Sequence, residues 1–145
     1  MKVCALFGHR DCPENISEKL YNSIEKLILQ KNINVFYVGT HGNFDKLAYR
    51  VLKQIKDKHS IKIYVVLAYL NNKDVFYDAD ETIFPSVLEN TPIRYAIVKR
   101  NNYMIDKCDC VICYVNDSFS NAYTFVNRAK KKSADIINIG SYRFD

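Results

Sequence analysis

Residues 35–45 read Val-Phe-Tyr-Val-Gly-Thr-His-Gly-Asn-Phe-Asp. The apolar residues at the start are typical of a buried strand, and the two glycines predict a turn into a helix that opens near Asn43. Such a turn collects free backbone N–H groups and the positive end of a helix dipole at one point, which favours an anion. A similar transition occurs near the N-terminus, where apolar residues 3–7 are followed by Gly-His-Arg.

Apolar runs and amphipathic segments alternate through the first half of the chain. The helix that follows residue 42 has the clearest 3.6-residue periodicity, with Phe44, Leu47 and Val51 on one face and lysines on the other. This alternation predicts βαβ units and a parallel sheet with right-handed crossovers. The expected strands cover residues 2–7, 33–38 and 61–67, and the expected helices cover residues 15–30 and 43–55.

The pattern lapses over residues 68–92, a loop long enough to act as a lid, a binding loop or an interface. A short helix is expected near residues 86–89. The elements expected after the loop are a short strand at 94–98, a short helix at 99–107, a strand at 110–115, a helix near 122–129 and a strand at 136–139. The sequence therefore predicts one α/β domain over residues 1–145, a doubly wound, mostly parallel, Rossmann-like sheet with helices on both faces.

The distribution of charge and the length of the apolar runs argue against two kinds of partner, nucleic acid and membrane. The net charge is +5, and the lysines and arginines are scattered along predicted helix faces instead of forming one basic face. We therefore expect nucleic acid to be an unlikely partner. No apolar run reaches the length of a membrane span, so no membrane partner is expected.

Five cysteines, Cys4, Cys12, Cys108, Cys110 and Cys113, are an odd number, and no signal peptide is recognisable. This combination predicts reduced thiols and a cytoplasmic location. The last three cysteines overlap an apolar strand, where Cys110 and Cys113 would face opposite sides. We interpret them as core residues and expect no metal site. No dinucleotide or Walker motif is present, so no cofactor is predicted.

In doubly wound sheets, ligands bind at the carboxyl ends of the strands, near the point where the strand order reverses. Polar and glycine residues follow several predicted strands. The predicted ligand-binding residues are Gly8, His9, Arg10, Gly39, Thr40, Gly42, Asn43, Asp45, Arg100, Asn101, Ser120 and Asn121.

Structural roles remain open for several of these residues. The glycines can serve a tight turn, and Asp45 in the first helical turn is stabilised by the helix dipole without any ligand. The alternative role for Asp45 is a contact with a ribose hydroxyl. Arg100, expected between a strand and a helix, can grip a phosphate or pair with the acidic 69–91 loop.

Three ordered motifs carry a family resemblance: Gly8-His9-Arg10, Gly39-x-x-Gly42-Asn43-Phe44-Asp45 and Arg100-Asn101-x-x-Met104-Ile105-Asp106. Together they resemble the SLOG superfamily, and more closely its small stand-alone YpsA-like bacterial members. This superfamily is related to the Lonely Guy phosphoribohydrolases and to the Rossmann-like domain of DprA. The resemblance covers nearly the whole chain. It implies a Rossmann-like domain that binds a nucleotide or nucleotide-derived ligand, and a homo-oligomer, most simply a dimer.

Lonely Guy enzymes cleave an N-glycosidic bond and carry a Pro-Gly-Gly-x-Gly-Thr-x-x-Glu loop after the strand that corresponds to residues 110–115. This chain has Asn-Asp-Ser-Phe-Ser-Asn-Ala-Tyr at 116–123, without the glycine pair or the glutamate. The leading hypothesis is therefore a binding or sensor protein. The first alternative is an N-glycoside hydrolase acting on a nucleoside monophosphate, with His41 as an acid and a carboxylate among Asp45, Asp80, Glu81, Glu89 and Asp106. The second alternative is a protein-interaction module, with the 69–91 loop and exposed aromatic residues as a self-association surface.

Overall fold

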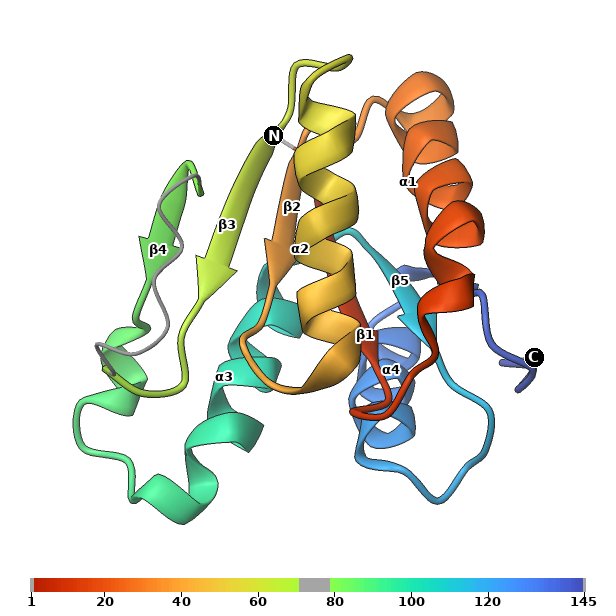
Figure 1. The fold of residues 1–145 in the computed structure, drawn as a ribbon. Helices are drawn as coiled ribbons and strands as arrows, with labels where there is room; N and C mark the ends of the chain where they lie inside the picture. Colours follow the sequence, from red (N-terminus) through yellow and green to blue (C-terminus); the bar gives the residue numbers. More distant parts are fainter. Residues whose placement is uncertain (1, 71–78, 145) are drawn as a thin grey trace.

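The computed structural model describes residues 2–70 and 79–144. One six-stranded sheet forms its centre, with the strand order β4-β3-β2-β1-β5-β6 and parallel pairing between all these neighbours (Figure 1). The prediction of a doubly wound parallel sheet is confirmed. The strands are β1 (Val3–Gly8), β2 (Val35–Val38), β3 (Lys62–Val66), β4 (Glu81–Ile83), β5 (Cys110–Tyr114) and β6 (Asp135–Asn138).

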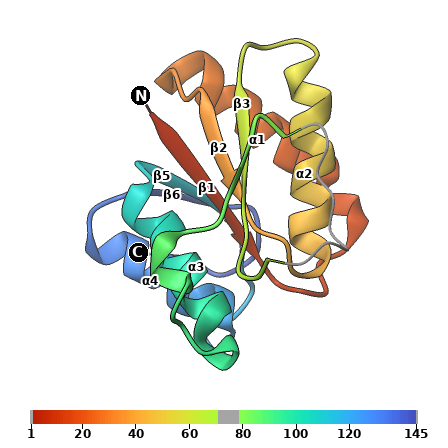
Figure 2. The ribbon, with the colours of Figure 1, turned by 90° about the vertical axis from the view of Figure 1, so that its left-hand side faces the viewer.

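Helices cover both faces of the sheet. In Figure 2 the strands lie between two helix pairs, α1 with α2 on one side and α3 with α4 on the other. Across the described ranges, no helix combines the length and the apolar character needed to cross a membrane. The helices are α1 (Ser17–Lys31), α2 (Gly42–Lys56), α3 (Ile93–Lys107) and α4 (Asn121–Lys131), with 3-10 turns η1 (Glu14–Ile16) and η2 (Ser86–Leu88).

The core lies in two layers because side chains alternate along each strand. In β1, Leu6 packs on the side of α1 and α2, while Ala5 and Phe7 pack on the side of α3 and α4. Cys110 and Cys113 divide between the same two layers, as the sequence predicted. All five cysteines are buried and free, and the interpretation of Cys108, Cys110 and Cys113 as core residues is confirmed.

The prediction for residues 94–107 is wrong in one respect. Residues 94–98 were expected to form a strand, but they belong to the single helix α3. Buried Ala96, Arg100 and Met104 recur four residues apart, so one helical face supplies the contacts with the sheet. The sheet edge beside β3 is instead occupied by β4, a short strand that the sequence analysis missed. Residues 71–78 of the predicted 69–91 loop lie outside the described residues.

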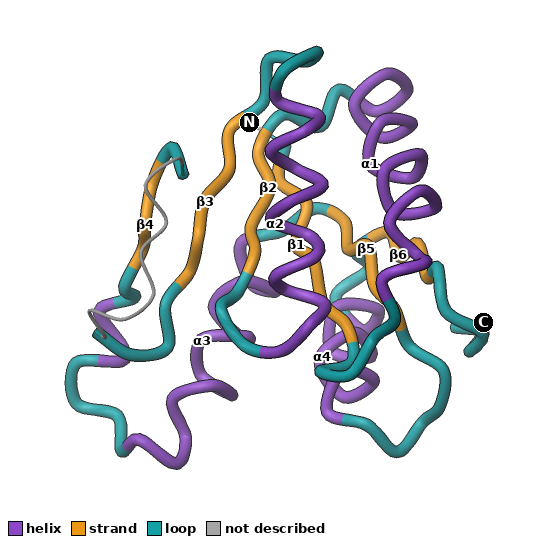
Figure 3. Tube along the Cα trace, viewed as in Figure 1, coloured by secondary structure: helices purple, strands orange, loops and turns teal. Residues whose placement is uncertain are grey.

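The strand order indicates the edge of the sheet at which a ligand is expected to bind. The chain runs from β1 outward through β2 and β3 to β4, and it then crosses to β5 and β6 on the other side of β1. The order therefore reverses between β1 and β5. Figure 3 shows that the loops after β1 and β2 turn at the same, lower edge of the sheet. A ligand is expected at this point because the loops on its two sides diverge to opposite faces.

Candidate functional site

A pocket of about 490 Å³ opens at the carboxyl edge of the sheet, where the order reverses. It is bounded by the loops after β1 and β2, one face of α3 and the start of α4. The predicted ligand-binding residues that line it are Gly8, His9, Arg10, Gly39, Asp45, Arg100, Asn101, Ser120 and Asn121. Thr40, Gly42 and Asn43 are not among the lining residues, although they contact residues that are.

Arg100 is the most buried charged residue of the site, with 1% of its surface exposed. It lies in the middle of α3 and not between a strand and a helix, as had been expected. Its Nη1 donates to the Val66 carbonyl at 2.9 Å and to Thr40 Oγ1 at 3.4 Å, and its Nε donates to Asn101 Oδ1 at 2.7 Å. Nη2 makes no hydrogen bond with any described residue. Nη2 is therefore the nitrogen of this guanidinium that is left for a ligand.

Asp45 faces Arg100 across Gly39. Its Oδ2 accepts a hydrogen bond from the backbone N–H of His41 at 2.9 Å, while its Oδ1 has no hydrogen-bond donor among the described residues. Burial raises the pKa of Asp45 to about 6, although the positive charge of Arg100 and the His41 N–H both lower it. At neutral pH the carboxyl is therefore mostly ionised and acts as an acceptor.

Gly39 permits this arrangement. A Cβ at residue 39 would stand 2.8 Å from Asp45 Oδ2 and 2.9 Å from Arg100 Nη1. Among the hydrogen bonds of the described residues, none joins the two charged side chains directly. Both approach Gly39 closely, so a carboxylate and a guanidinium lie near each other in the pocket lining.

Gly42 and Asn43 hold the two neighbouring loops together. Gly42 has φ +88°, and a Cβ there would stand 2.8 Å from Arg10 Cα. The Asn43 N–H donates to the Arg10 carbonyl at 2.7 Å. Two backbone N–H groups of the turn, those of His41 and Asn43, are thus already bonded within the protein. The turn therefore offers an anion fewer amides than its sequence suggested.

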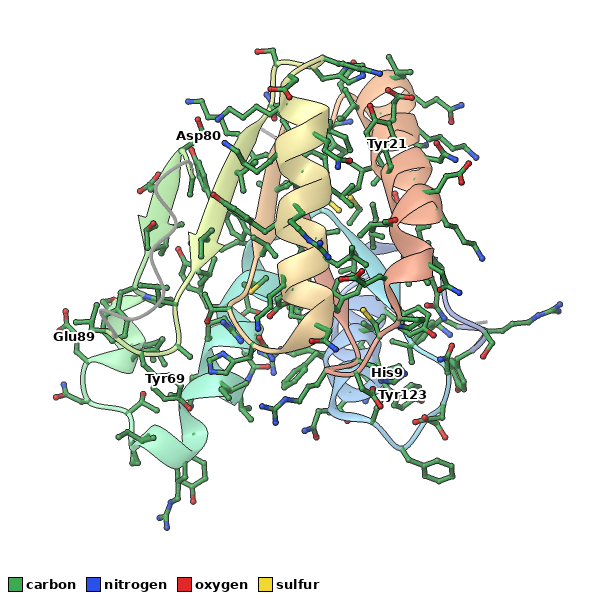
Figure 4. All side chains as sticks on the ribbon, viewed as in Figure 1. His9, Tyr21, Tyr69, Asp80, Glu89 and Tyr123 are labelled. Atoms are coloured by element: carbon green, nitrogen blue, oxygen red, sulfur yellow. The ribbon has the colours of Figure 1, made fainter. Side chains whose placement is uncertain are left out.

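His9 is fixed in one hydrogen-bonding state. Its Nε2 accepts from the backbone N–H of Asn116 at 2.9 Å, and its ring meets Tyr114 edge-on with 5.6 Å between ring centroids. A backbone N–H can only donate, so the neutral imidazole carries its proton on Nδ1. His9 therefore carries its N–H on Nδ1 and is not arranged as a base through Nε2. Figure 4 shows His9 near the lower edge of the sheet.

Asp11, Arg94, Ile97 and Val98 are among the pocket residues that the sequence analysis missed. Three of them lie on α3, and with Asn101 and Met104 they form one helical face at spacings of three and four residues. The assignment of residues 94–98 to a strand hid this face. The helical spacing was the signal that could have revealed it.

Four of the five carboxylates considered for hydrolysis lie outside the pocket lining. Asp80 bonds to Lys56 and to the backbone N–H of Ile63, and these contacts lower its pKa against the raising effect of burial. Asp106 pairs with Arg128 at 3.4 Å. Glu81 begins the edge strand β4, and in Figure 4 Asp80 and Glu89 lie away from His9. Asp45 is the one member of that set which lines the pocket, together with His41.

The loop before α4 forms the last border of the site. Ser120 caps α4, because its Oγ accepts from the Tyr123 N–H at 3.1 Å, and the preceding Phe119 is 94% exposed. Ser120 and Asn121 both line the pocket. The start of a helix thus lies at the pocket border, with its positive dipole end nearby.

Comparison with known proteins gives a likeness in fold. No protein-family model and no curated protein matches the sequence. Among solved structures, the chain is similar to DNA processing protein A from Helicobacter pylori, whose structure was described for its single-stranded DNA binding mode. The TM-score is 0.64 and the sequence identity 16%, with 94% of this chain and 64% of that chain covered. The chain thus spans less than two thirds of the length of that protein.

Proposed function

We propose that this protein binds a nucleotide or nucleotide-derived ligand in the pocket at the carboxyl edge of the sheet. The observation that carries the proposal is the buried guanidinium of Arg100 on the floor of a pocket with apolar walls and two further arginines on its lining. A nucleotide combines a planar, largely apolar base with an anionic phosphate, and this lining offers a partner for each.

The charges favour an anion at the rim. Arg10 and Arg94 are exposed and line the pocket, while Asp11 is the one exposed carboxylate on the same lining. Arg94 also stacks on the Tyr95 ring, with 4.8 Å between its guanidinium carbon and the ring centroid. Stacking limits the motion of the side chain, so less entropy is lost when it binds a phosphate. The net charge of +5 would draw an anionic ligand toward the molecule.

Membership of the SLOG superfamily, near its YpsA-like members, is part of this proposal. It is supported by the three ordered motifs and by a fold like that of DNA processing protein A. A likeness at 16% identity supports the fold alone, so the ligand class rests on the chemistry of the pocket.

A panel of nucleoside monophosphates tests the proposal in thermal unfolding experiments. A ligand that binds the native state raises the melting temperature in proportion to the logarithm of its concentration, once it is in excess. Arg10→Ala and Arg94→Ala should each weaken binding about five- to tenfold, the loss of one charge-assisted hydrogen bond. Arg50→Ala is the matched control. Its arginine pairs with Glu14 at 3.1 Å on the outer surface of α2, and it does not line this pocket. No shift with any nucleotide would refute the proposal.

Single-stranded nucleic acid is a second candidate, against our expectation from the scattered charge. It is favoured by the fold likeness to a protein described for single-stranded DNA binding, and by the exposed aromatic ring of Phe119 beside the pocket. Exposed aromatic rings can stack on bases. Fluorescence anisotropy with a labelled oligonucleotide tests it. This candidate predicts an affinity that rises with strand length and falls in Phe119→Ala, whereas the mononucleotide site predicts neither.

N-glycoside hydrolysis remains an alternative because Asp45 and His41 both line the pocket. Such chemistry usually employs an acid and a second group that stabilises the sugar cation or activates water. Incubation with nucleoside monophosphates, followed by chromatography, would show free base if the reaction occurs. Release of base that is lost in Asp45→Asn would establish the alternative.

Self-association is proposed on separate grounds. Several large apolar side chains of α3 and the turn before it are exposed, led by Ile93 at 76%. Light scattering after size-exclusion chromatography measures the mass directly. A dimer through this surface would dissociate in Ile93→Ser, whereas Leu29→Ser on the far helix α1 would leave it intact. The exposed apolar residues concerned are Val87, Ile93 and Tyr95; Val98 is exposed as well but lines the pocket.

A further inference from the structure

We infer that the ligand enters with its uncharged, hydrogen-bonding end first, so that Asp45 and Arg100 read the base at the pocket floor while the phosphate stays at the rim. The inference rests on the proposed function and deepens it, because it fixes the orientation of the ligand and names the residues that determine specificity.

Two unused hydrogen-bonding atoms lie at the floor. Arg100 Nη2 is a donor without a partner among the described residues, and Asp45 Oδ1 is an acceptor in the same condition. Both side chains line the pocket, and their atoms nearest Gly39, Asp45 Oδ2 and Arg100 Nη1, are already bonded within the protein, which leaves Oδ1 and Nη2 for a group in the pocket. A group bound there must present an acceptor to Arg100 and, beside it, a donor to Asp45.

A phosphate does not meet this requirement. An ionised phosphate presents only acceptors, and one of its oxygens would face the carboxylate of Asp45. The charge of Asp45 offsets that of Arg100, so the floor as a pair offers an anion little net attraction. A base edge with a ring N–H or amino group next to a carbonyl oxygen or ring nitrogen satisfies both atoms at once. An unsatisfied buried partner is costly, so a mismatched group is rejected.

The walls above the floor suit a flat apolar ring. Ile97, Val98 and Met104 come from one face of α3, and Phe125 comes from α4. These side chains offer no hydrogen bonds to compete with the floor pair. The cationic side chains Arg10 and Arg94 are exposed, so they remain at the mouth of the pocket. The distribution of charge therefore matches a ligand with an uncharged inner end and an anionic outer end.

The amides of the turn after β2 support the same orientation. A phosphate at the floor would need the backbone N–H groups near the start of α2, the usual helix-terminus site. The His41 N–H is held by Asp45, and the Asn43 N–H is held by the Arg10 carbonyl. Both donors are therefore withdrawn from such a site.

Titration calorimetry with a mononucleotide and its own nucleoside tests the inference. The probe pair is the nucleoside monophosphate that gives the largest thermal shift, and the same compound without its phosphate. We expect Asp45→Asn to weaken both ligands by a similar factor, about fivefold or more, because it replaces an acceptor-only group with an amide. Arg10→Ala should weaken the nucleotide about fivefold and the nucleoside less than twofold. Arg50→Ala should change neither.

The opposite orientation makes the opposite prediction. If the phosphate lay at the floor, Asp45→Asn would remove a repulsive charge and tighten nucleotide binding, with little effect on the nucleoside. That result would overturn the inference and leave the proposed function standing. If neither ligand binds, the proposed function fails first. Asn keeps the shape of Asp and an acceptor for the His41 N–H, and a cooperative melt of the variant establishes that it is folded.

Discussion

Gly39 is the residue on which the geometry of the pocket floor depends. Its backbone lies outside the left-handed region, so alanine would be tolerated there by the chain itself. The constraint comes from the neighbours, since a Cβ would meet both Asp45 and Arg100 at less than 3.0 Å. The sequence predicted a glycine turn after a strand. It could not show this constraint, because Arg100 lies sixty-one residues further along the chain.

Gly39→Ala should therefore lower the free energy of unfolding by about 1–3 kcal/mol, the usual cost of overpacking. Chemical denaturation measures the change. In the Asp45→Ala background the same substitution should cost less, because one of the two groups that the Cβ meets is gone. Equal costs in both backgrounds would mean that Asp45 does not crowd Gly39.

Asp45 should also make stability depend on pH. Its pKa is about 6 in the folded protein, above the value near 3.9 of an unfolded chain. Between these two values the folded state holds a proton that the unfolded state has released, so this group's contribution to stability falls as pH rises from about 4 to 6. Asp45→Asn removes that contribution. Denaturation at pH 4.5 and 7.0 should show the variant gaining stability relative to the wild type at the higher pH. A difference that stays constant would contradict the raised pKa.

At the scale of elements, hydrophobic periodicity predicted secondary structure best in segments whose apolar residues fit a helix and do not also resemble a strand. The helix α2 has six buried apolar side chains at helical spacing, and it was predicted almost to the residue. In α3 the apolar run Tyr95-Ala96-Ile97-Val98 imitated a strand. The evidence for a helix extends further along the chain, because buried residues recur every four positions at Ala96, Arg100 and Met104. The same misreading hid Arg94 and the pocket face of α3.

The helical state of this segment can be tested at Lys99, which is exposed on α3. In a helix, Lys99→Ala should be more stable than Lys99→Thr by up to about 0.7 kcal/mol. A strand would reverse the order, because threonine is favoured there and alanine is not. Lys62, exposed in β3, provides the matched control, and the same two substitutions should show the reversed order at that position. Denaturant unfolding gives each difference.

At the scale of the whole molecule, alternation of strands and helices predicted the sheet and the edge at which its loops meet. The pocket indeed lies where the strand order reverses between β1 and β5. The sequence could not show which polar groups are already hydrogen-bonded within the protein. The N–H groups of His41 and Asn43, and Nε2 of His9, are bonded by partners that only the fold brings near. Free donors therefore have to be found in the structure.

The division between an exposed cationic rim and a buried neutral floor predicts how salt acts on binding. Exposed charges are screened over about 8–10 Å at physiological ionic strength and about 3 Å at 1 M salt, whereas buried pairs are screened much less. Nucleotide affinity should therefore fall about three- to tenfold between low and high sodium chloride, as contacts to Arg10 and Arg94 weaken. Nucleoside affinity, which depends on Asp45, Arg100 and the apolar walls, should change less than twofold. Calorimetric titrations at three salt concentrations compare the two. Equal losses for both ligands would mean that exposed charges hold the base as well, and the separation of rim and floor would then be wrong.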